Sequence, residues 1–127
     1  MSFKTSLLGK EGEELALGFL KAQGYRIKER NFKNKLGEID IVAQDKDTIC
    51  FIEVKTRTSE DFGGPLEAVI QRKQRKLSQL ALSYLKSKNL LNEKARFDVV
   101  SLIKNEDGAP EISLLKDAFE LSSPYAY

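Results

Sequence analysis

The sequence predicts an α/β domain in which a helix precedes three strands and a long helix precedes two more. Two stretches, residues 10–23 and 65–88, repeat apolar residues at helical spacing. Three stretches rich in β-branched residues, 39–43, 49–54 and 95–104, have the pattern of strands. With an edge strand at 25–32 and a short strand at 111–115, the order is αβββαββ, a central mixed sheet flanked by helices.

The composition is that of an ordinary soluble domain. The chain has 127 residues, of which 41% are hydrophobic and 31% charged, and its net charge of +2 is too small to indicate a nucleic-acid partner by itself. There is no histidine, which excludes Ser-His-Asp and Cys-His catalysis and histidine-ligated metal sites. Cys50 is the single cysteine, and its place in an apolar strand predicts a buried, unreactive thiol.

No stretch has the apolar length of a signal peptide or a membrane span, so we expect a cytoplasmic protein that does not enter membranes. Residues 1–121 are expected to form a single domain and residues 122–127 a flexible tail. The segments 21–35 and 65–88 are basic, and the segment 106–120 is acidic. Such a distribution would attract a polyanion, although solvated helix faces would give the same counts.

The first helix is expected at residues 10–23, with Gly24 as its stop. Glu11, Glu13 and Glu14 fall in its expected first turn, where the helix dipole favours acidic side chains, so N-terminal stabilisation is the simplest interpretation of all three. An edge strand from Tyr25 to Phe32 follows, and the polar run 33–35 leads into a hairpin.

The hairpin joins residues 39–43 to residues 49–54. In the second strand, period-two alternation puts Glu53 and Lys55 together on the face opposite Ile52. A two-residue turn at 46–47, or a four-residue loop at 45–48, pairs residues whose numbers sum to 93, so that Asp40 lies across from Glu53. A three-residue loop would instead separate the two carboxylates by face.

Two interpretations of these charges remain open at this point. Facing carboxylates at Asp40 and Glu53 suit a hard divalent cation such as Mg²⁺, with Lys55 beside it. Alternatively, the charges form a solvated sheet face on which Glu38 pairs with Lys55 and Arg57 neutralises Glu53. Spacing alone favours neither.

The long helix is expected over residues 65–88, with Pro65 at its start. Its apolar stripe passes through position 73, so Lys73 projects from the face that packs on the sheet. Either Lys73 extends along the edge of the core, or it reaches the carboxylate site or a phosphate held there. After the strand at 95–104, a turn at Asp107 and Gly108 leads to the strand at 111–115, and residues 117–121 are expected to add an edge segment.

The element order, with Asp40 followed by Glu53-Val54-Lys55, resembles the PD-(D/E)xK nuclease superfamily, which has the three-layer restriction-endonuclease-like fold. More closely, the chain resembles the YraN family of small bacterial proteins, related to archaeal Holliday-junction resolvases. Ile39 stands where the superfamily has a proline, which removes no ligand. The matching positions are Gly12, Glu13, Ala16, Leu20, Gly24, Tyr25, Asn31, 37–40, 51–55, Arg57, Phe62, Gly63, Lys73 and 96–100.

The resemblance implies that Asp40, Glu53 and the main-chain carbonyl of Val54 bind Mg²⁺ or Mn²⁺. It also implies that Lys55 orients or activates an attacking water and that Glu13 faces the same site. Basic residues are expected to contact nucleic-acid phosphates, namely Arg57, Arg72, Lys73, Arg75 and Lys76.

The expected function is therefore a metal-dependent endonuclease that hydrolyses phosphodiesters in branched or otherwise structured DNA, with a homodimer as one expected assembly. The alternative is a non-catalytic nucleic-acid-binding or scaffold protein that retains the nuclease fold.

Overall fold

The computed structural model describes residues 3–58, 71–105 and 108–120. The described strands form a five-stranded sheet in the order β1-β2-β3-β4-β5, in which β3 and β4 are parallel and the other neighbouring pairs are antiparallel. This αβββαββ order and mixed sheet confirm the predicted restriction-endonuclease-like fold. The elements are α1 (Phe3–Ala22), β1 (Arg26–Asn34), β2 (Gly37–Asp45), β3 (Thr48–Thr58), α2 (Gln71–Ser87), β4 (Lys94–Lys104) and β5 (Glu111–Leu115).

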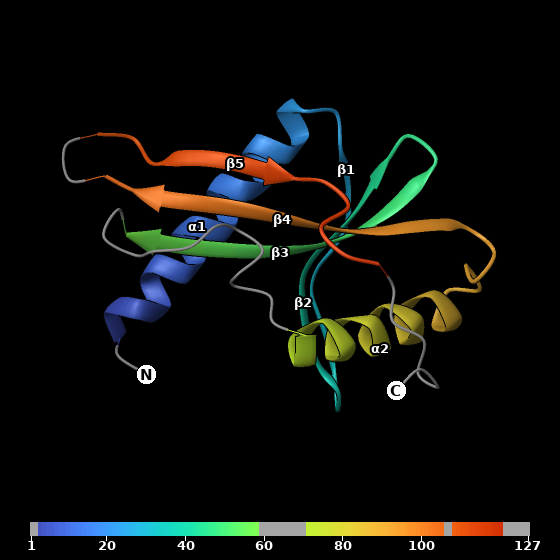
Figure 1. Ribbon diagram of the computed structural model, residues 1–127. Helices are drawn as coiled ribbons and strands as arrows, with labels where there is room; N and C mark the ends of the chain where they lie inside the picture. Colours follow the sequence, from blue (N-terminus) through green and yellow to red (C-terminus); the bar gives the residue numbers. More distant parts are fainter. Residues whose placement is uncertain (1–2, 59–70, 106–107, 121–127) are drawn as a thin grey trace.

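The two helices cover opposite faces of the sheet and make it the middle of three layers (Figure 1). In β3, Ile49 and Phe51 face the core under α2, whereas Cys50 and Ile52 face the core under α1. This alternation is the predicted one. Burial raises the pKa of the Cys50 thiol to about 12, as expected for an unreactive cysteine. Neither described helix is long and apolar enough to cross a membrane.

β2 and β3 pair near their hairpin turn and then separate. Their paired residues run from Asp45 and Thr48 to Ile41 and Ile52, and each pair sums to 93, which confirms the predicted register. Lys46 has a φ of 57° in the turn. Beyond Ile41, β2 continues beside β1 while β3 continues beside β4, and Figure 1 shows β1 and β2 crossing the other strands steeply. Asp40 and Glu53 lie where the two strands diverge.

α1 begins seven residues before its expected start, so the helix-dipole interpretation of its acidic residues is wrong. The first turn of α1 contains no acid, and Glu11, Glu13 and Glu14 lie near the middle of the helix. Gly12 is buried where α1 crosses β3, and a Cβ there would overlap Oγ1 of Thr56. Close packing on β3 therefore outweighs the low helix propensity of glycine.

The expected edge segment at 117–121 is wrong for its described residues, 117–120, which form no strand. Asp117 has a φ of 54°, which an extended strand cannot continue through. The Ala118 amide donates to the Phe97 carbonyl at 2.7 Å, and the Phe119 ring stacks on Phe97 with centroids 4.4 Å apart. The turn packs the partly buried Phe119 against the core under α2.

Several predictions lie outside the described residues. They concern the helical segment 65–70 with Pro65, the matching positions Phe62 and Gly63, Asp107 of the last turn, and the tail at 122–127. The antiparallel pairing of β4 with β5 is that of the predicted hairpin.

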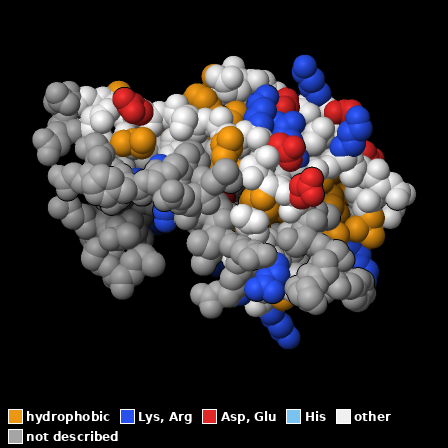
Figure 2. Space-filling view, in the orientation of Figure 1, with side chains coloured by type: hydrophobic (Ala, Val, Ile, Leu, Met, Phe, Trp, Pro, Cys, Tyr) orange, Lys and Arg blue, Asp and Glu red, His pale blue; other side chains and the backbone are white. Residues whose placement is uncertain are grey.

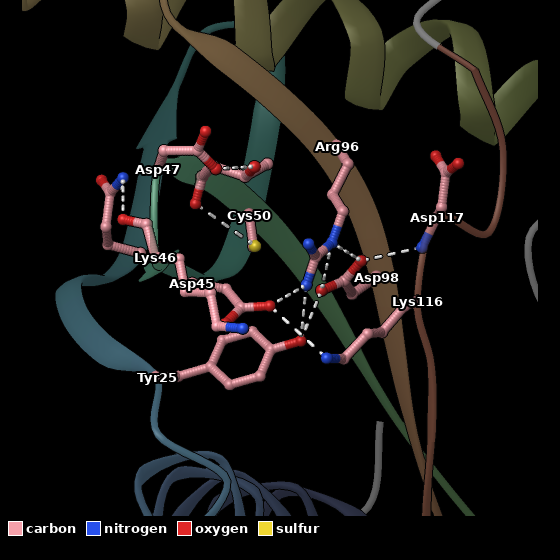
Figure 3. Close-up of polar contacts among 11 residues, drawn as sticks. Tyr25, Asp45, Lys46, Asp47, Cys50, Arg96, Asp98, Lys116 and Asp117 are labelled. Atoms are coloured by element: carbon pink, nitrogen blue, oxygen red, sulfur yellow. Dashed lines mark hydrogen bonds and ion pairs between the residues drawn. The ribbon is translucent and has the colours of Figure 1, made fainter.

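An unpredicted, buried polar network surrounds Asp98 (Figure 3). This carboxylate is 1% exposed and accepts hydrogen bonds from Nε of Arg96 at 3.0 Å, from the Tyr25 hydroxyl at 2.9 Å and from the Asp117 amide at 2.9 Å. Arg96 also pairs with Asp45 at 2.7 Å. A buried charge requires partners, and Asp98 finds them in several segments. The network therefore links the end of β2, β4 and the segment after β5.

Candidate metal and catalytic site

Asp40 is placed by an irregularity that β2 shares with β1. Ile39 faces the core under α2 and Ile41 the core under α1, although residues two apart share a face in a regular strand. In β1, Asn31 lies between the pairs Arg30–Ile41 and Phe32–Ile39 and has a φ of 52°. Asparagine adopts this left-handed conformation more readily than most residues. The two strands thus depart from regular geometry at facing positions.

The Asp40 side chain is directed toward β3. Its Oδ2 accepts a hydrogen bond from the Val54 amide at 2.8 Å, which brings the carboxylate next to the residue that follows Glu53. The regular β2–β3 ladder ends one pair earlier, at Ile41 and Ile52. Side-chain hydrogen bonding therefore holds Asp40 in place where ladder pairing has stopped.

Negative charge accumulates around Asp40. Burial raises the pKa of its carboxyl to about 7, with further contributions from Glu53, Glu13 and Glu38, and the Val54 hydrogen bond only partly opposes them. Like charges in a half-buried site destabilise one another unless a cation lies among them. This is the electrostatic setting expected of a divalent-metal site.

Lys73 on α2 forms an ion pair with Oε1 of Glu53. The Glu53 side chain is 12% exposed and that of Lys73 is 39% exposed. This contact confirms that Lys73 reaches the carboxylate site, which was one of two alternatives for it. Arg57, expected in one interpretation to neutralise Glu53, donates to Oγ of Ser101 at 3.4 Å.

Glu13 approaches the site from α1. Its Oε1 accepts a hydrogen bond from Nδ2 of Asn31 at 2.8 Å, and its charge contributes to the raised pKa of Asp40. The backbone of Asn31 therefore forms the kink opposite Asp40, and its side chain orients Glu13. Asn31 is a site residue that was not predicted, and the asparagine within a predicted strand was the one local signal for it.

Lys55 lies two residues after Glu53 on β3, opposite Ser101 of β4. The Cα atoms of Glu53 and Lys55 are about 6.6 Å apart by strand geometry. The Lys55 side chain is half-buried, and it makes no hydrogen bond or ion pair with the residues that the structure describes. In particular, the alternative pairing of Glu38 with Lys55 is not found between these two described side chains.

Basic residues continue along α2 beside Lys73. Arg75 and Lys76 are exposed, while the side chain of Arg72 lies outside the described part of the chain. On the face shown in Figure 2, the described acidic and basic side chains are intermingled. No large area of one sign is visible among the described side chains of this face.

The donors at this site suit Mg²⁺ or Mn²⁺. Asp40 and Glu53 provide carboxylate oxygens, and the carbonyl of Val54 is a further oxygen donor next to them. Within residues 3–58, 71–105 and 108–120, no group of three or more acidic, histidine or cysteine side chains is arranged to hold a metal. The described acidic ligands at this site are therefore two, Asp40 and Glu53.

Comparison with known proteins gives the family. The sequence pattern of "Uncharacterised protein family UPF0102" matches residues 12–102. The UPF0102 protein of Geotalea uraniireducens is 50% identical over 115 residues, 91% of each chain. That of Syntrophus aciditrophicus is 48% identical over 114 residues, 90% of this chain and 89% of the relative. That of Caldicellulosiruptor saccharolyticus is 48% identical over 115 residues, 88% of this chain and 96% of the relative. The matched region contains every described residue of the candidate site, and the chain belongs to the UPF0102 family, the YraN family that its motifs resemble.

Proposed function

We propose that this protein is an endonuclease that uses Mg²⁺ or Mn²⁺ to hydrolyse phosphodiester bonds in branched or otherwise structured DNA. The observation that carries the proposal is the Asp40 carboxylate, held beside Glu53 where β2 and β3 separate, with a pKa raised to about 7. A site that disfavours its own negative charge gains most from a divalent cation.

Each side chain has a distinct part in this proposal. Asp40 and Glu53 would hold the metal from two diverging strands, with the carbonyl of Val54 as a third donor. The bound ion supplies Lewis-acid stabilisation of the phosphate and lowers the pKa of a water ligand. Lys55, on the same face of β3 as Glu53, orients the attacking water and stabilises charge that develops on the phosphate. Glu13, oriented by Asn31, completes the acidic side of the site.

The partner in this proposal is recognised through its phosphates. Lys73, Arg75 and Lys76 follow one another on α2, which adjoins Glu53 through Lys73. Lysine and arginine bind DNA phosphates in a salt-dependent and largely sequence-independent manner. Such contacts suit a protein that recognises DNA structure, and Arg57 and Arg72 would add to them.

One observation favours the alternative, a nucleic-acid-binding protein without catalysis. Lys73 of the same chain neutralises Glu53 through an ion pair. A site satisfied in this way could serve as a structural support in a protein that binds DNA through α2.

Cleavage of a labelled four-way DNA junction in Mg²⁺ or Mn²⁺ tests the proposal. Wild type should cleave, and Asp40→Asn should reduce cleavage by about 10²-fold or more, the scale of a lost electrostatic group. If wild type binds the junction and cleaves neither it nor flap or single-stranded DNA, the non-catalytic alternative replaces the nuclease.

A further inference from the structure

Among the described residues, Glu53 has a cationic partner, whereas Asp40 has none. Lys73 contacts Oε1 of Glu53, and the hydrogen-bond partner of Asp40 among the described residues is the neutral Val54 amide. Glu53 is mostly withdrawn from water, so its charge requires a partner in the metal-free protein. One of the two carboxylates that a metal would use is therefore occupied by an ammonium group of the same chain.

We infer that Lys73 is a built-in counter-cation that competes with the divalent metal for Glu53 and, once displaced, binds a phosphate of the nucleic acid. The inference rests on the proposed metal site and adds a regulatory link to it. Metal binding and phosphate binding then strengthen each other, because each uses the state in which Lys73 has left Glu53.

The position of Lys73 allows this exchange. Its side chain is 39% exposed and emerges near the first described turn of α2, so its flexible stem can move toward solvent without disturbing the core. A metal at Glu53 would repel the ammonium group at short distance. Lys76, one turn further along α2, is exposed beside it, so the displaced group would join an existing basic surface.

A purely structural ion pair would behave differently. If Lys73 served to attach α2 to β3, its removal would lower stability and leave Mn²⁺ affinity unchanged or weaker. If Lys73 competes with the metal, its removal strengthens Mn²⁺ binding even though it also lowers the stability of the metal-free protein. Under the competition, removal of Lys73 therefore raises the affinity for Mn²⁺ and lowers the stability of the metal-free protein.

The test is calorimetric titration of Mn²⁺ into full-length wild type and three variants. Lys73→Met keeps the length of the stem and removes the charge, and Lys73→Arg keeps the charge. Lys86→Met removes one positive charge from the exposed last turn of the same helix. We expect Lys73→Met to bind Mn²⁺ about three- to tenfold more tightly, the scale of a partly exposed ion pair and its repulsion. The other two variants should resemble wild type.

The outcomes separate this inference from the proposed function. Equal or weaker Mn²⁺ binding by Lys73→Met overturns the competition and leaves the metal site standing. An equal gain in Lys86→Met overturns it as well, because net charge would then explain the effect. Mn²⁺ binding by Lys73→Met and by no other protein supports the competition. Absence of Mn²⁺ binding in wild type and in all three variants overturns both the competition and the proposed metal site.

A thermal measurement provides an independent readout of the same exchange. The Mn²⁺-induced rise in melting temperature should be larger in Lys73→Met than in wild type.

A cleavage-resistant phosphorothioate oligonucleotide tests the phosphate half of the inference. Mn²⁺ should increase the affinity of wild type for this oligonucleotide more than that of Lys73→Met. An equal increase in both would overturn the transfer of Lys73 to phosphate.

Discussion

Asn31 and Asp40 face each other at the point where β1 and β2 both leave regular strand geometry. Asn31 adopts a φ of 52°, and the alternation of side chains in β2 changes at Asp40. This coupled irregularity directs Asp40 toward the Val54 amide and allows the Asn31 side chain to bind Glu13. Two acidic residues of the candidate site thus depend on one backbone kink.

Asn31 substitutions should separate the kink from the side-chain contact. Asn31→Gly retains the left-handed conformation, and we expect its unfolding free energy to remain within about 1 kcal/mol of wild type. Asn31→Val places a β-branched residue at positive φ, which should cost about 1–3 kcal/mol and weaken Mn²⁺ binding through displacement of Asp40. Denaturant unfolding and Mn²⁺ titration measure the two effects. Equal stability of both variants would show that the kink is not retained in solution.

The pH dependence of stability follows from the raised pKa of Asp40. The carboxyl titrates near pH 7 in the folded protein and near 3.9 in the unfolded chain. The folded state therefore binds more protons between these values, and stability is lost as pH rises from about 4 to about 7.

Asp40→Asn should remove this loss, because the amide oxygen can still accept the Val54 hydrogen bond. We expect the metal-free variant to exceed wild type by about 1–3 kcal/mol at pH 8 and by less at pH 4.5. Urea unfolding at both pH values without metal measures the difference. A variant less stable than wild type at pH 8 would indicate that ionised Asp40 stabilises the fold.

Lys55 can be tested without disturbing the metal ligands. Lys55→Met retains the aliphatic stem and removes the charge, so Mn²⁺ and DNA binding should stay close to wild type. Cleavage of a labelled four-way junction should fall by about 10²-fold or more, as expected when a group acting on the attacking water is lost. Cleavage at the wild-type rate would leave the nuclease proposal intact and remove Lys55 from it.

The basic surface of α2 should appear in the salt dependence of DNA binding. Lys76 is exposed one turn after Lys73, and Lys76→Ala should reduce the slope of log K against log salt by about one if it contacts a phosphate. Lys86→Ala, in the last turn of the same helix, is the matched control and should not change the slope. A slope equally affected by both would point to a general charge effect.

Glycines of α1 provide a test of its packing. Gly12→Ala would bring a Cβ against Thr56, and we expect a loss of about 1–3 kcal/mol. Gly9→Ala adds a methyl group in open space within the same helix and should stabilise by up to about 1 kcal/mol. Thermal unfolding of the two variants compares them directly. A stabilising effect of Gly12→Ala would contradict the close approach of α1 to β3.

Local patterns were sufficient to predict the order of the elements. The sum of 93 between β2 and β3 followed for a two- or four-residue loop, whereas a three-residue loop remained open until the paired strands were seen. Period-two alternation placed Glu53 and Ile52 on opposite faces of β3. Helical spacing was sufficient to direct Lys73 inward. These features depend on neighbours within a few residues, which is the range over which a single sequence is informative.

The arrangement of the site required contacts between distant segments. The kink at Asp40 depends on Asn31 in another strand, and the early start of α1 accompanies the packing of Gly12 on Thr56. The partner of Glu53 depended on where α2 crosses the sheet, which brought Lys73 to it. Asp98 has one near partner, Arg96, two residues away in the same strand, but the partners that complete its network, Tyr25 and Asp117, lie 73 and 19 residues away. Sequence periodicity sets the face on which a side chain lies, whereas strand divergence and helix packing determine which charges meet there.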